Sequence, residues 1–202
     1  MIKTKQDRKT RYFKEYLEIN NELIKINAGA DKGIYLEILT RMIGQLDTAY
    51  SIHKRVLVVR FDLHLKHYTP NNEVISKFIK RTKQWLARNY KMKDIGYAWV
   101  RELERAKAQH YHLVLFLDGD KIRYPAKLIK HIKETWSDNG YIPTIKNPYY
   151  FLDKHNHKEM RAEAINRISY LAKTRGKRYR DPQTKDYGAS RLKTRVINEY
   201  KF

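Results

Sequence analysis

The sequence predicts an α+β fold with a central antiparallel β-sheet flanked by helices. A strand-like segment over 55–65 is followed by a helical segment, then by two strands with a tight connection, and then by two more helical segments. No glycine-rich phosphate loop follows any of these strands, which excludes P-loop and dinucleotide-binding folds. The length of 202 residues accommodates one sizeable domain with an extension.

Residues 1–53 are predicted to form an N-terminal helical extension. Apolar residues recur near helical spacing over 5–27 and again over 32–53, and Gly29 and Gly33 punctuate the segment 28–33. We therefore expect two helices, neither of which carries a chemical motif. Residues 54–202 are predicted to form the principal domain, which ends in a basic tail beyond Gly176.

The segment from Arg55 to Leu65 predicts a strand, because β-branched residues are followed by alternating apolar and polar side chains. The polar face of the alternating part carries Arg60, Asp62 and His64. The apolar face carries Val59, Phe61, Leu63 and Leu65. This pattern is typical of a strand that packs on a core with one face.

Periodicity places the remaining elements. An apolar stripe predicts a helix over about 73–91. Two strands over 95–104 and 110–117 come next, and the short connection between them predicts a hairpin. Further helices are expected over about 125–139 and 158–174, with a loop or short strands between them.

The chain is strongly basic, with 43 Lys and Arg residues against 22 Asp and Glu residues and a formal charge of +21. Such an excess usually accompanies a polyanion, and nucleic acid is the default because basic side chains release counterions from phosphates. A soluble basic surface without a partner is the alternative. The absence of cysteine excludes disulfides, thiolate zinc sites and cysteine nucleophiles. Without an apolar signal segment or a membrane-length apolar run, we expect a soluble cytoplasmic protein with no membrane partner.

The second strand of the predicted hairpin contains the motif His110-Tyr111-His112. Residues at i and i+2 of a strand share a face, so both imidazoles point the same way and can chelate one divalent ion. A third ligand is expected from the neighbouring strand, where Glu102 and Glu104 share parity and both remain candidates. Two imidazoles and a carboxylate leave coordination positions open for phosphate oxygens, which suits Mg²⁺ or Mn²⁺. Ordinary hydrogen bonding by the two histidines is the alternative.

A second histidine pair, His155-Asn156-His157, lies in a charged stretch without apolar neighbours. We interpret it as a solvated loop before a helix, without a metal site.

The final predicted helix presents a candidate nucleophile. Tyr170 falls off its apolar stripe, with cations such as Arg167 and Lys173 one turn away. A phenol has a pKa of ~10 and is a poor nucleophile until a cation, base or metal favours the phenolate. Lys173 therefore activates Tyr170 or binds the phosphate. A tyrosine that merely extends along the surface is the alternative.

Three motifs in this order resemble the HUH endonucleases: Val100-Arg101-Glu102, His110-Tyr111-His112 and Tyr170-Leu171-Ala172-Lys173. The tail Asp186-Tyr187-Gly188-Ala189-Ser190-Arg191 is similar to the Gly-x-Ser-Arg ending of one branch. That branch contains inovirus (filamentous-phage) replication initiators and prophage relatives with a YagK/YfjJ-type C-terminal domain. The resemblance covers about residues 54–195, which marks 54–202 as an HUH-type nuclease domain.

The resemblance implies rolling-circle replication initiated by a nick in single-stranded DNA. His110, His112 and Glu102 are then the ligands of Mg²⁺ or Mn²⁺, with Glu104 still possible as the third. Tyr170 is the nucleophile that forms a 5′-phosphotyrosine link and frees a 3′-OH, and Lys173 is the assisting cation. A second nucleophilic tyrosine has no match in this helix.

The expected partners are single-stranded or origin DNA and a host helicase or polymerase. The residues expected to contact DNA are Arg60, His64, Arg101, Arg167, Lys177 and Arg191. A DNA-binding replication or transcription regulator that no longer cuts is the alternative function on the same fold. The nickase differs from it in requiring His110, His112 and Tyr170 to converge.

Overall fold

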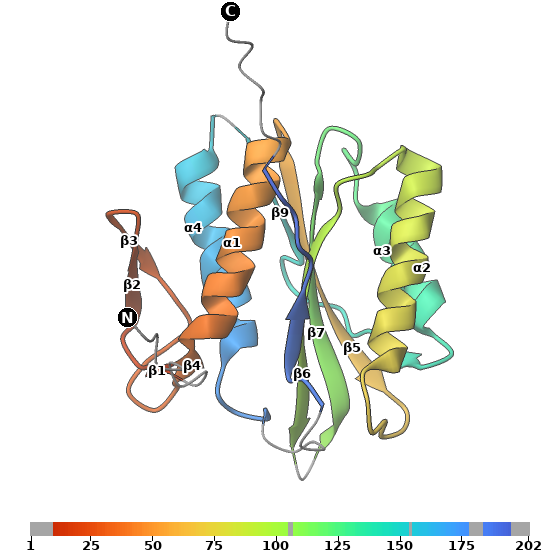
Figure 1. Cartoon of the computed structure of the whole chain (residues 1–202), viewed down its shortest axis with the longest axis horizontal. Coiled ribbons are helices and arrows are strands. Elements are labelled where there is room, and N and C mark those ends of the chain that lie inside the picture. The colour runs from red at the N-terminus through yellow and green to blue at the C-terminus, as the bar shows by residue number, and fades with distance from the viewer. Residues whose placement is uncertain (1–9, 105–106, 154, 178–183, 195–202) are drawn as a thin grey trace, which may run out of the picture.

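A computed structural model of the protein describes residues 10–104, 107–153, 155–177 and 184–194. At its centre is a six-stranded antiparallel sheet in the order β10-β6-β7-β5-β8, in which β9 also pairs with β5 (Figure 1). The strands are β5 (Val56–Leu65), β6 (Gly96–Glu104), β7 (Lys107–Asp118), β8 (Gly140–Tyr141), β9 (Tyr149–Leu152) and β10 (Tyr187–Ala189). The predicted α+β class is confirmed.

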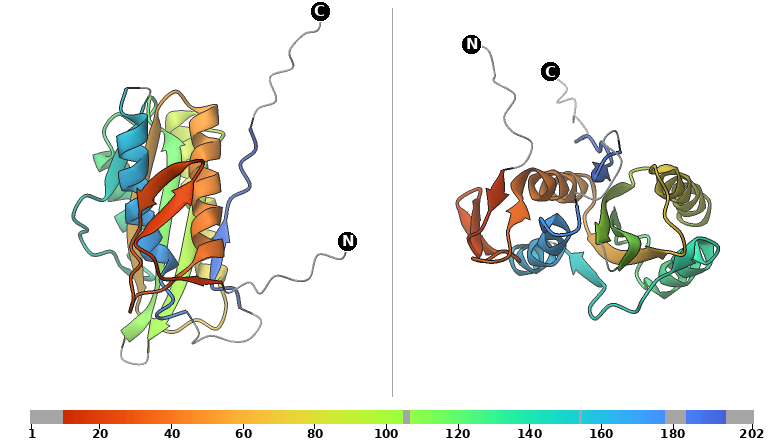
Figure 2. Two further views of the ribbon diagram at one scale, coloured as in Figure 1. Left: turned by 90° about the vertical axis from the view of Figure 1, so that its left-hand side faces the viewer. Right: turned by 90° about the horizontal axis from the view of Figure 1, so that it is seen from below.

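Helices cover both faces of this sheet (Figure 2). One face packs against α1 (Leu36–Ile52) and α4 (His157–Ser169), and the other packs against α2 (Glu73–Tyr90) and α3 (Ala126–Trp136). None of the helices in the described ranges combines the length and the apolar character needed to cross a membrane.

The face under α1 and α4 changes from apolar to polar at the same level of three adjacent strands. Its apolar part consists of Val56, Val58, Ala98, Val100, Val114 and Phe116. Its polar part consists of Arg60, Asp62, His64, Glu102, His110 and His112. The register pairs Asp62 with His112, and His110 with both His64 and Glu102. Directly opposed residues share a face, so the polar side chains gather at one end of the sheet.

The elements predicted between residues 55 and 139 are confirmed: the strand is β5, the helix after it is α2, the hairpin is β6 and β7, and the next helix is α3. The last helix is shorter than predicted. It ends at Ser169 and continues as a 3₁₀ turn over Tyr170–Ala172 (η1), so Lys173 lies outside it. The expectation that Tyr170 and Lys173 share one helical face is therefore wrong, although the turn still brings them together.

The predicted helix over 5–27 is wrong for the described residues, which form short strands. These are β1 (Arg11–Tyr12), β2 (Tyr16–Ile19), β3 (Glu22–Lys25) and, after them, β4 (Ile34–Tyr35). Asn20 and Asn21 join β2 to β3 with φ angles of 51° and 63°. Positive φ at both central residues matches the twist of a two-residue hairpin, and asparagine tolerates it. The second predicted helix of this region is confirmed as α1.

The N-terminal part shares a core with the sheet. Ile24, Ile26 and Ile34 belong to the same buried cluster as Val56 and Val58 of β5. Residues on both sides of the predicted boundary after residue 53 therefore pack together. Of the basic tail predicted beyond Gly176, Lys177 and residues 184–194 are described, and β10 in the latter range pairs with β6. Residues 178–183 and 195–202 lie outside the described residues.

Candidate metal centre and the adjoining tyrosine

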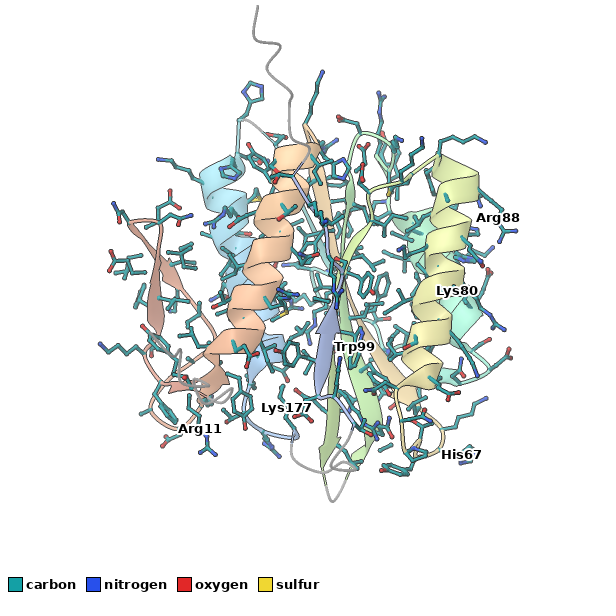
Figure 3. The ribbon with its side chains drawn as sticks, viewed as in Figure 1. Arg11, His67, Lys80, Arg88, Trp99 and Lys177 are labelled. Carbon is teal, nitrogen blue, oxygen red and sulfur yellow. The ribbon has the colours of Figure 1, made fainter. Side chains whose placement is uncertain are left out.

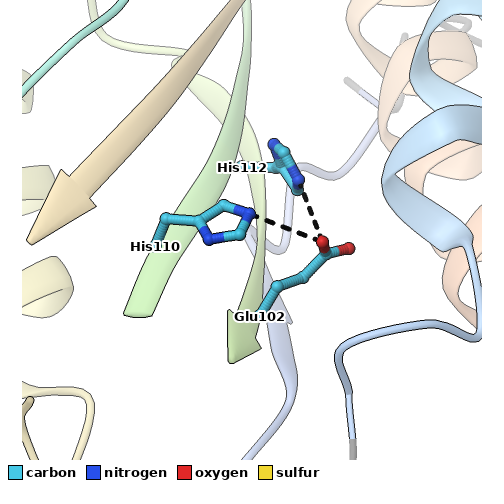
Figure 4. A group of neighbouring side chains, drawn as sticks. All are labelled: Glu102, His110 and His112. Carbon is cyan, nitrogen blue, oxygen red and sulfur yellow. Dashed lines mark ion pairs between the residues drawn. The ribbon is translucent and has the colours of Figure 1, made fainter. Parts of the chain in front are cut away.

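Glu102 of β6 and His110 and His112 of β7 form a buried group at the polar end of the sheet (Figure 4). Glu102 Oε2 lies 3.5 Å from Nε2 of His110 and 3.3 Å from Nε2 of His112. One ligand atom from each residue lies within 4.8 Å of the others, and no other such group of three occurs in the described part of the chain. Both imidazoles point to the same side of the sheet, as predicted. The side chain of Glu104, the alternative third ligand, lies outside the described residues.

Each of the three side chains has a further partner that orients it. His112 Nδ1–H donates to Asp62 Oδ1 at 2.6 Å, and His110 Nδ1 lies 3.3 Å from the Ala108 carbonyl oxygen. Because these contacts occupy Nδ1 of each histidine, both Nε2 atoms face Glu102 and could bind a metal ion. Many metal sites use such a second partner to set the imidazole tautomer. Two imidazole nitrogens and a carboxylate oxygen fit a divalent metal ion.

The side chain of Lys177 is buried against Glu102, the candidate third ligand, and does not reach the protein surface. Its side chain has 0% relative exposure, and its Nζ donates to Glu102 Oε1 at 2.5 Å. Figure 3 shows Lys177 between η1 and the sheet, near this end of β6. The Leu103 N–H donates to the Gly176 carbonyl at 2.8 Å and fixes the segment beside β6. Because Lys177 takes Oε1, Glu102 presents Oε2 alone to the histidines.

The charges of the group support one another. Burial raises the pKa of Glu102, but hydrogen bonds from His110 and His112 and the charge of Lys177 outweigh it and hold this pKa well below its usual range. Burial likewise raises the pKa of Asp62, yet His112 and Arg60 bring it down to about 2. Burial lowers the pKa of His112, but its hydrogen bonds to Asp62 and Glu102 and the charges of these carboxylates raise it by more. The net effect is a pKa above the usual value for histidine. A metal at Nε2 therefore competes with a firmly held proton.

Tyr170 lies beside this group. Its ring meets that of His112 edge to face, with centroids 5.8 Å apart and planes at 87°. The Arg60 guanidinium lies 4.7 Å and the Lys173 ammonium 3.6 Å from the centre of the tyrosine ring. With 37% relative exposure, Tyr170 remains accessible to a ligand on this face. The ring of Tyr170 thus contacts that of His112, one of the two histidines with which it is expected from the sequence to converge.

Lys173 is partly buried among cations. Burial lowers its pKa, and the positive charges of Lys32, Arg60 and Lys177 lower it further, while Glu102 acts in the opposite direction. Its ammonium therefore gives up a proton more readily than that of an exposed lysine.

The segment between β3 and β4 holds the turn that carries Tyr170. The Asn27 N–H donates to Ser169 Oγ at 2.7 Å, directly before the tyrosine. The Thr174 N–H donates to the Gly33 carbonyl at 2.9 Å, directly after Lys173. The chain is thus hydrogen-bonded on both sides of η1, which gives the first part of the sequence a positioning role that its pattern did not reveal.

The residues predicted to contact DNA fall into different environments. Arg60 and His64 lie on the polar face, where Arg60 donates to both oxygens of Asp62 at 3.0 Å. Arg167, near the end of α4, donates to the Lys146 carbonyl at 2.6 Å. Lys177 is the buried partner of Glu102, as described above. Its prediction as a surface contact therefore finds no support in its position.

The other two predicted DNA contacts lie away from the metal group. Arg101 is buried on the opposite face of the sheet and donates to the Thr69 carbonyl at 2.6 Å. Arg191 is exposed and follows β10, which pairs with β6 from Val100 toward Ala98 and so runs away from Glu102.

The pair His155 and His157 forms no metal group in the described structure. His155 is exposed, while His157 begins α4 and stacks on Tyr50 with centroids 3.9 Å apart. The predicted solvated loop before a helix holds for His155, but not for His157, which is the first residue of α4 and packs on an aromatic ring.

Comparison with protein families matches residues 17–190 to the family described as the YagK/YfjJ C-terminal domain. The matched range runs from Leu17 in β2 to Ser190 just after β10 and contains Glu102, His110, His112 and Tyr170. Comparisons with curated proteins and with solved structures give no match. The match covers most of the chain, which therefore belongs to the YagK/YfjJ C-terminal domain family.

Proposed function

We propose that this protein is a metal-dependent HUH endonuclease that nicks and rejoins single-stranded DNA at a replication origin, as in rolling-circle replication initiators of inoviruses and prophages. The observation that carries the proposal is the packing of the Tyr170 ring on His112, at 5.8 Å between centroids. A tyrosine from one element and a His/His/Glu group from two others meet at an accessible position. A protein that only binds DNA has no need of that arrangement.

Glu102 Oε2 and the Nε2 atoms of His110 and His112 would hold Mg²⁺ or Mn²⁺. When bound, such an ion polarises the scissile phosphate and offsets its developing charge. Lys177 and Asp62 act through these ligands, since Lys177 occupies the second oxygen of Glu102 and Asp62 fixes the tautomer of His112.

Tyr170 acts as the nucleophile. Its phenolic oxygen attacks phosphorus, the bond from phosphorus to the 3′ oxygen breaks, and the phosphate becomes linked to the tyrosine at the 5′ side. The phenol loses one proton and the leaving 3′ oxygen gains one, so the step is balanced. Arg60 and Lys173 flank the ring, where their positive charges would counter the negative charge of the phosphate. Attack by a 3′-OH on the phosphotyrosine reverses the step and rejoins the strand.

The net charge of +21 supports a polyanionic partner. A host polymerase would extend the free 3′-OH, and a helicase would supply the single strand. Both are proposed partners, as are the cytoplasmic location and the origin itself.

The test uses a pool of single-stranded oligonucleotides labelled at the 3′ end, incubated with the protein and Mn²⁺. A 5′-phosphotyrosine keeps the downstream fragment on the protein, so the label should migrate with the protein in a denaturing gel. Tyr170→Phe retains the ring and its packing but lacks the nucleophile, and it should give no labelled protein. Tyr124→Phe is the matched control, because Tyr124 is 84% exposed and takes no part in the site.

Two results would contradict the proposal. Labelled protein at the wild-type level in Tyr170→Phe would remove the tyrosine from its role. Tight DNA binding by the wild type without any adduct, in Mg²⁺ or Mn²⁺, would favour the regulator that no longer cuts.

A further inference from the structure

A row of three aromatic rings leads from the metal group to the protein surface. His64 stacks on His110 with centroids 4.9 Å apart and planes at 11°. Tyr141 stacks on the other side of the row, 4.7 Å from His64 and at 15°. The rings belong to β7, β5 and β8 and are almost parallel. One end of the row is a candidate metal ligand and the other is a tyrosine with 62% relative exposure.

Strand pairing produces this row. His64 lies directly opposite His110 on one side and opposite Tyr141 on the other. Directly opposed residues on neighbouring strands project on the same face, so the three rings follow one line across the sheet.

The backbone around His64 is held tightly, which fixes the orientation of Tyr141. The Trp136 Nε1–H donates to the His64 carbonyl at 2.8 Å. Gly140 lies so close that a Cβ at its position would fall 1.8 Å from the same carbonyl oxygen. Any other residue at 140 would therefore push β8 away from β5. The ring of Tyr141 is thus presented to solvent by a rigid support, not by a mobile loop.

We infer that Tyr141 is a stacking platform for a nucleobase of the single strand that crosses the metal group. This inference deepens the proposed function and rests on it for the identity of the strand. One face of the Tyr141 ring already stacks on His64, so a nucleobase on the other face would extend the row by one ring. Stacking of this kind accepts any of the four bases. The exposed Lys66, whose backbone N–H donates to the Asn139 carbonyl at 2.9 Å beside β8, supplies a cation for the phosphate of that nucleotide.

The test measures binding of a labelled oligo(dT) and of an abasic oligonucleotide of the same length by fluorescence anisotropy, in the uncleaving Tyr170→Phe background. Tyr141→Ala should weaken oligo(dT) binding by roughly 5- to 100-fold. Tyr141→Phe should bind as tightly as the parent, because it keeps the ring. Tyr124→Ala is the matched control for loss of an exposed tyrosine outside the row and should have no effect. On the abasic strand, all four proteins should bind alike.

Equal binding of oligo(dT) by Tyr141→Ala and its parent would overturn the inference. An equal loss on the abasic strand would also overturn it, because the effect would then not depend on the base. The assay does not require cleavage. If Tyr141→Ala weakens binding only when bases are present, but the wild type forms no covalent adduct in the cleavage assay, only the proposed function is contradicted. If the wild type forms the adduct but Tyr141→Ala binds oligo(dT) like its parent, only this inference is contradicted.

Discussion

Replacing Lys177 by methionine should destabilise the metal-free protein because a buried carboxylate loses its counter-charge. The Lys177 side chain has 0% and the Glu102 side chain 10% relative exposure, and their charged atoms are 2.5 Å apart. Breaking a buried ion pair by removing one partner costs about 3–5 kcal/mol. Since Glu102 is slightly exposed, we expect the lower end, about 3 kcal/mol, which is roughly 6–12 °C in Tm for a protein of this size.

Thermal and urea unfolding in EDTA measure this effect, with two controls. Lys77→Met removes an ion pair whose partners are 74% and 67% exposed, and it should cost no more than about 0.5 kcal/mol. In a Glu102→Gln background, Lys177→Met should cost far less than in the wild type, because the buried charge is already gone. Mn²⁺ should restore more stability to Lys177→Met than to the wild type, since the ion then becomes the counter-charge.

A loss below about 0.5 kcal/mol for Lys177→Met would refute this reasoning, because His110 and His112 would then compensate the buried Glu102 charge without Lys177. An equal loss with and without the Glu102 carboxylate would refute it as well, since the effect would then come from packing alone.

Three further predictions concern Asp62, His112 and Gly140. Asp62→Asn should lower Mn²⁺ affinity about 10- to 100-fold in calorimetry, because the partner that fixes His112 is weakened; unchanged affinity would contradict this. Because the folded-state pKa of His112 is raised above 6.5, its contribution to metal-free stability is complete below pH 6.5 and is lost as the pH rises through the raised pKa. Mn²⁺ affinity should rise over that same interval, and a flat profile between pH 6 and 8 would oppose the assignment. Gly140→Ala should destabilise the protein by at least about 1–3 kcal/mol in urea unfolding, because its Cβ would meet the His64 carbonyl. Gly44→Ala, with nothing within 4 Å of the added Cβ inside α1, should instead stabilise by up to about 1 kcal/mol; similar effects of both would contradict the account.

The sequence predicted the fold well where hydrophobic periodicity was long and regular. β5, the β6–β7 hairpin, α2 and α3 all carry clear patterns of period 2 or 3.6. The strands before Lys25 are at most four residues long, too short to display an alternation that excludes a helix. Their clearest signal was Asn20-Asn21, since asparagine is among the residues that accept positive φ in a hairpin turn.

The sequence predicted the contacts of the candidate site that lie within one strand, but not those between residues far apart in the chain. The shared face of His110 and His112 follows from strand parity alone. The partners Asp62 and Lys177 do not, because they depend on the register between strands and on a contact 75 residues along the chain from Glu102. Lys177 is one of several cations in a basic segment, and nothing in that composition distinguishes a buried lysine from exposed ones.

Tyr141 illustrates the same limit. Its strand is two residues long, and the row of rings exists only because β8 pairs with β5 at His64. The predicted helix over about 125–139 ends just before Gly140, but the close approach of Gly140 to the His64 carbonyl required the tertiary structure.

Mass-spectrometric mapping of the protein–DNA adduct tests the central claim most directly. Trypsin cleaves after Arg167 and Lys173, so the peptide of residues 168–173 contains Tyr170 as its one tyrosine. After nuclease digestion of adduct formed with Mn²⁺, the account predicts that this peptide carries a nucleotide linked through its 5′ phosphate. A nucleotide on any other peptide, or an adduct that forms without this peptide being modified, would contradict it.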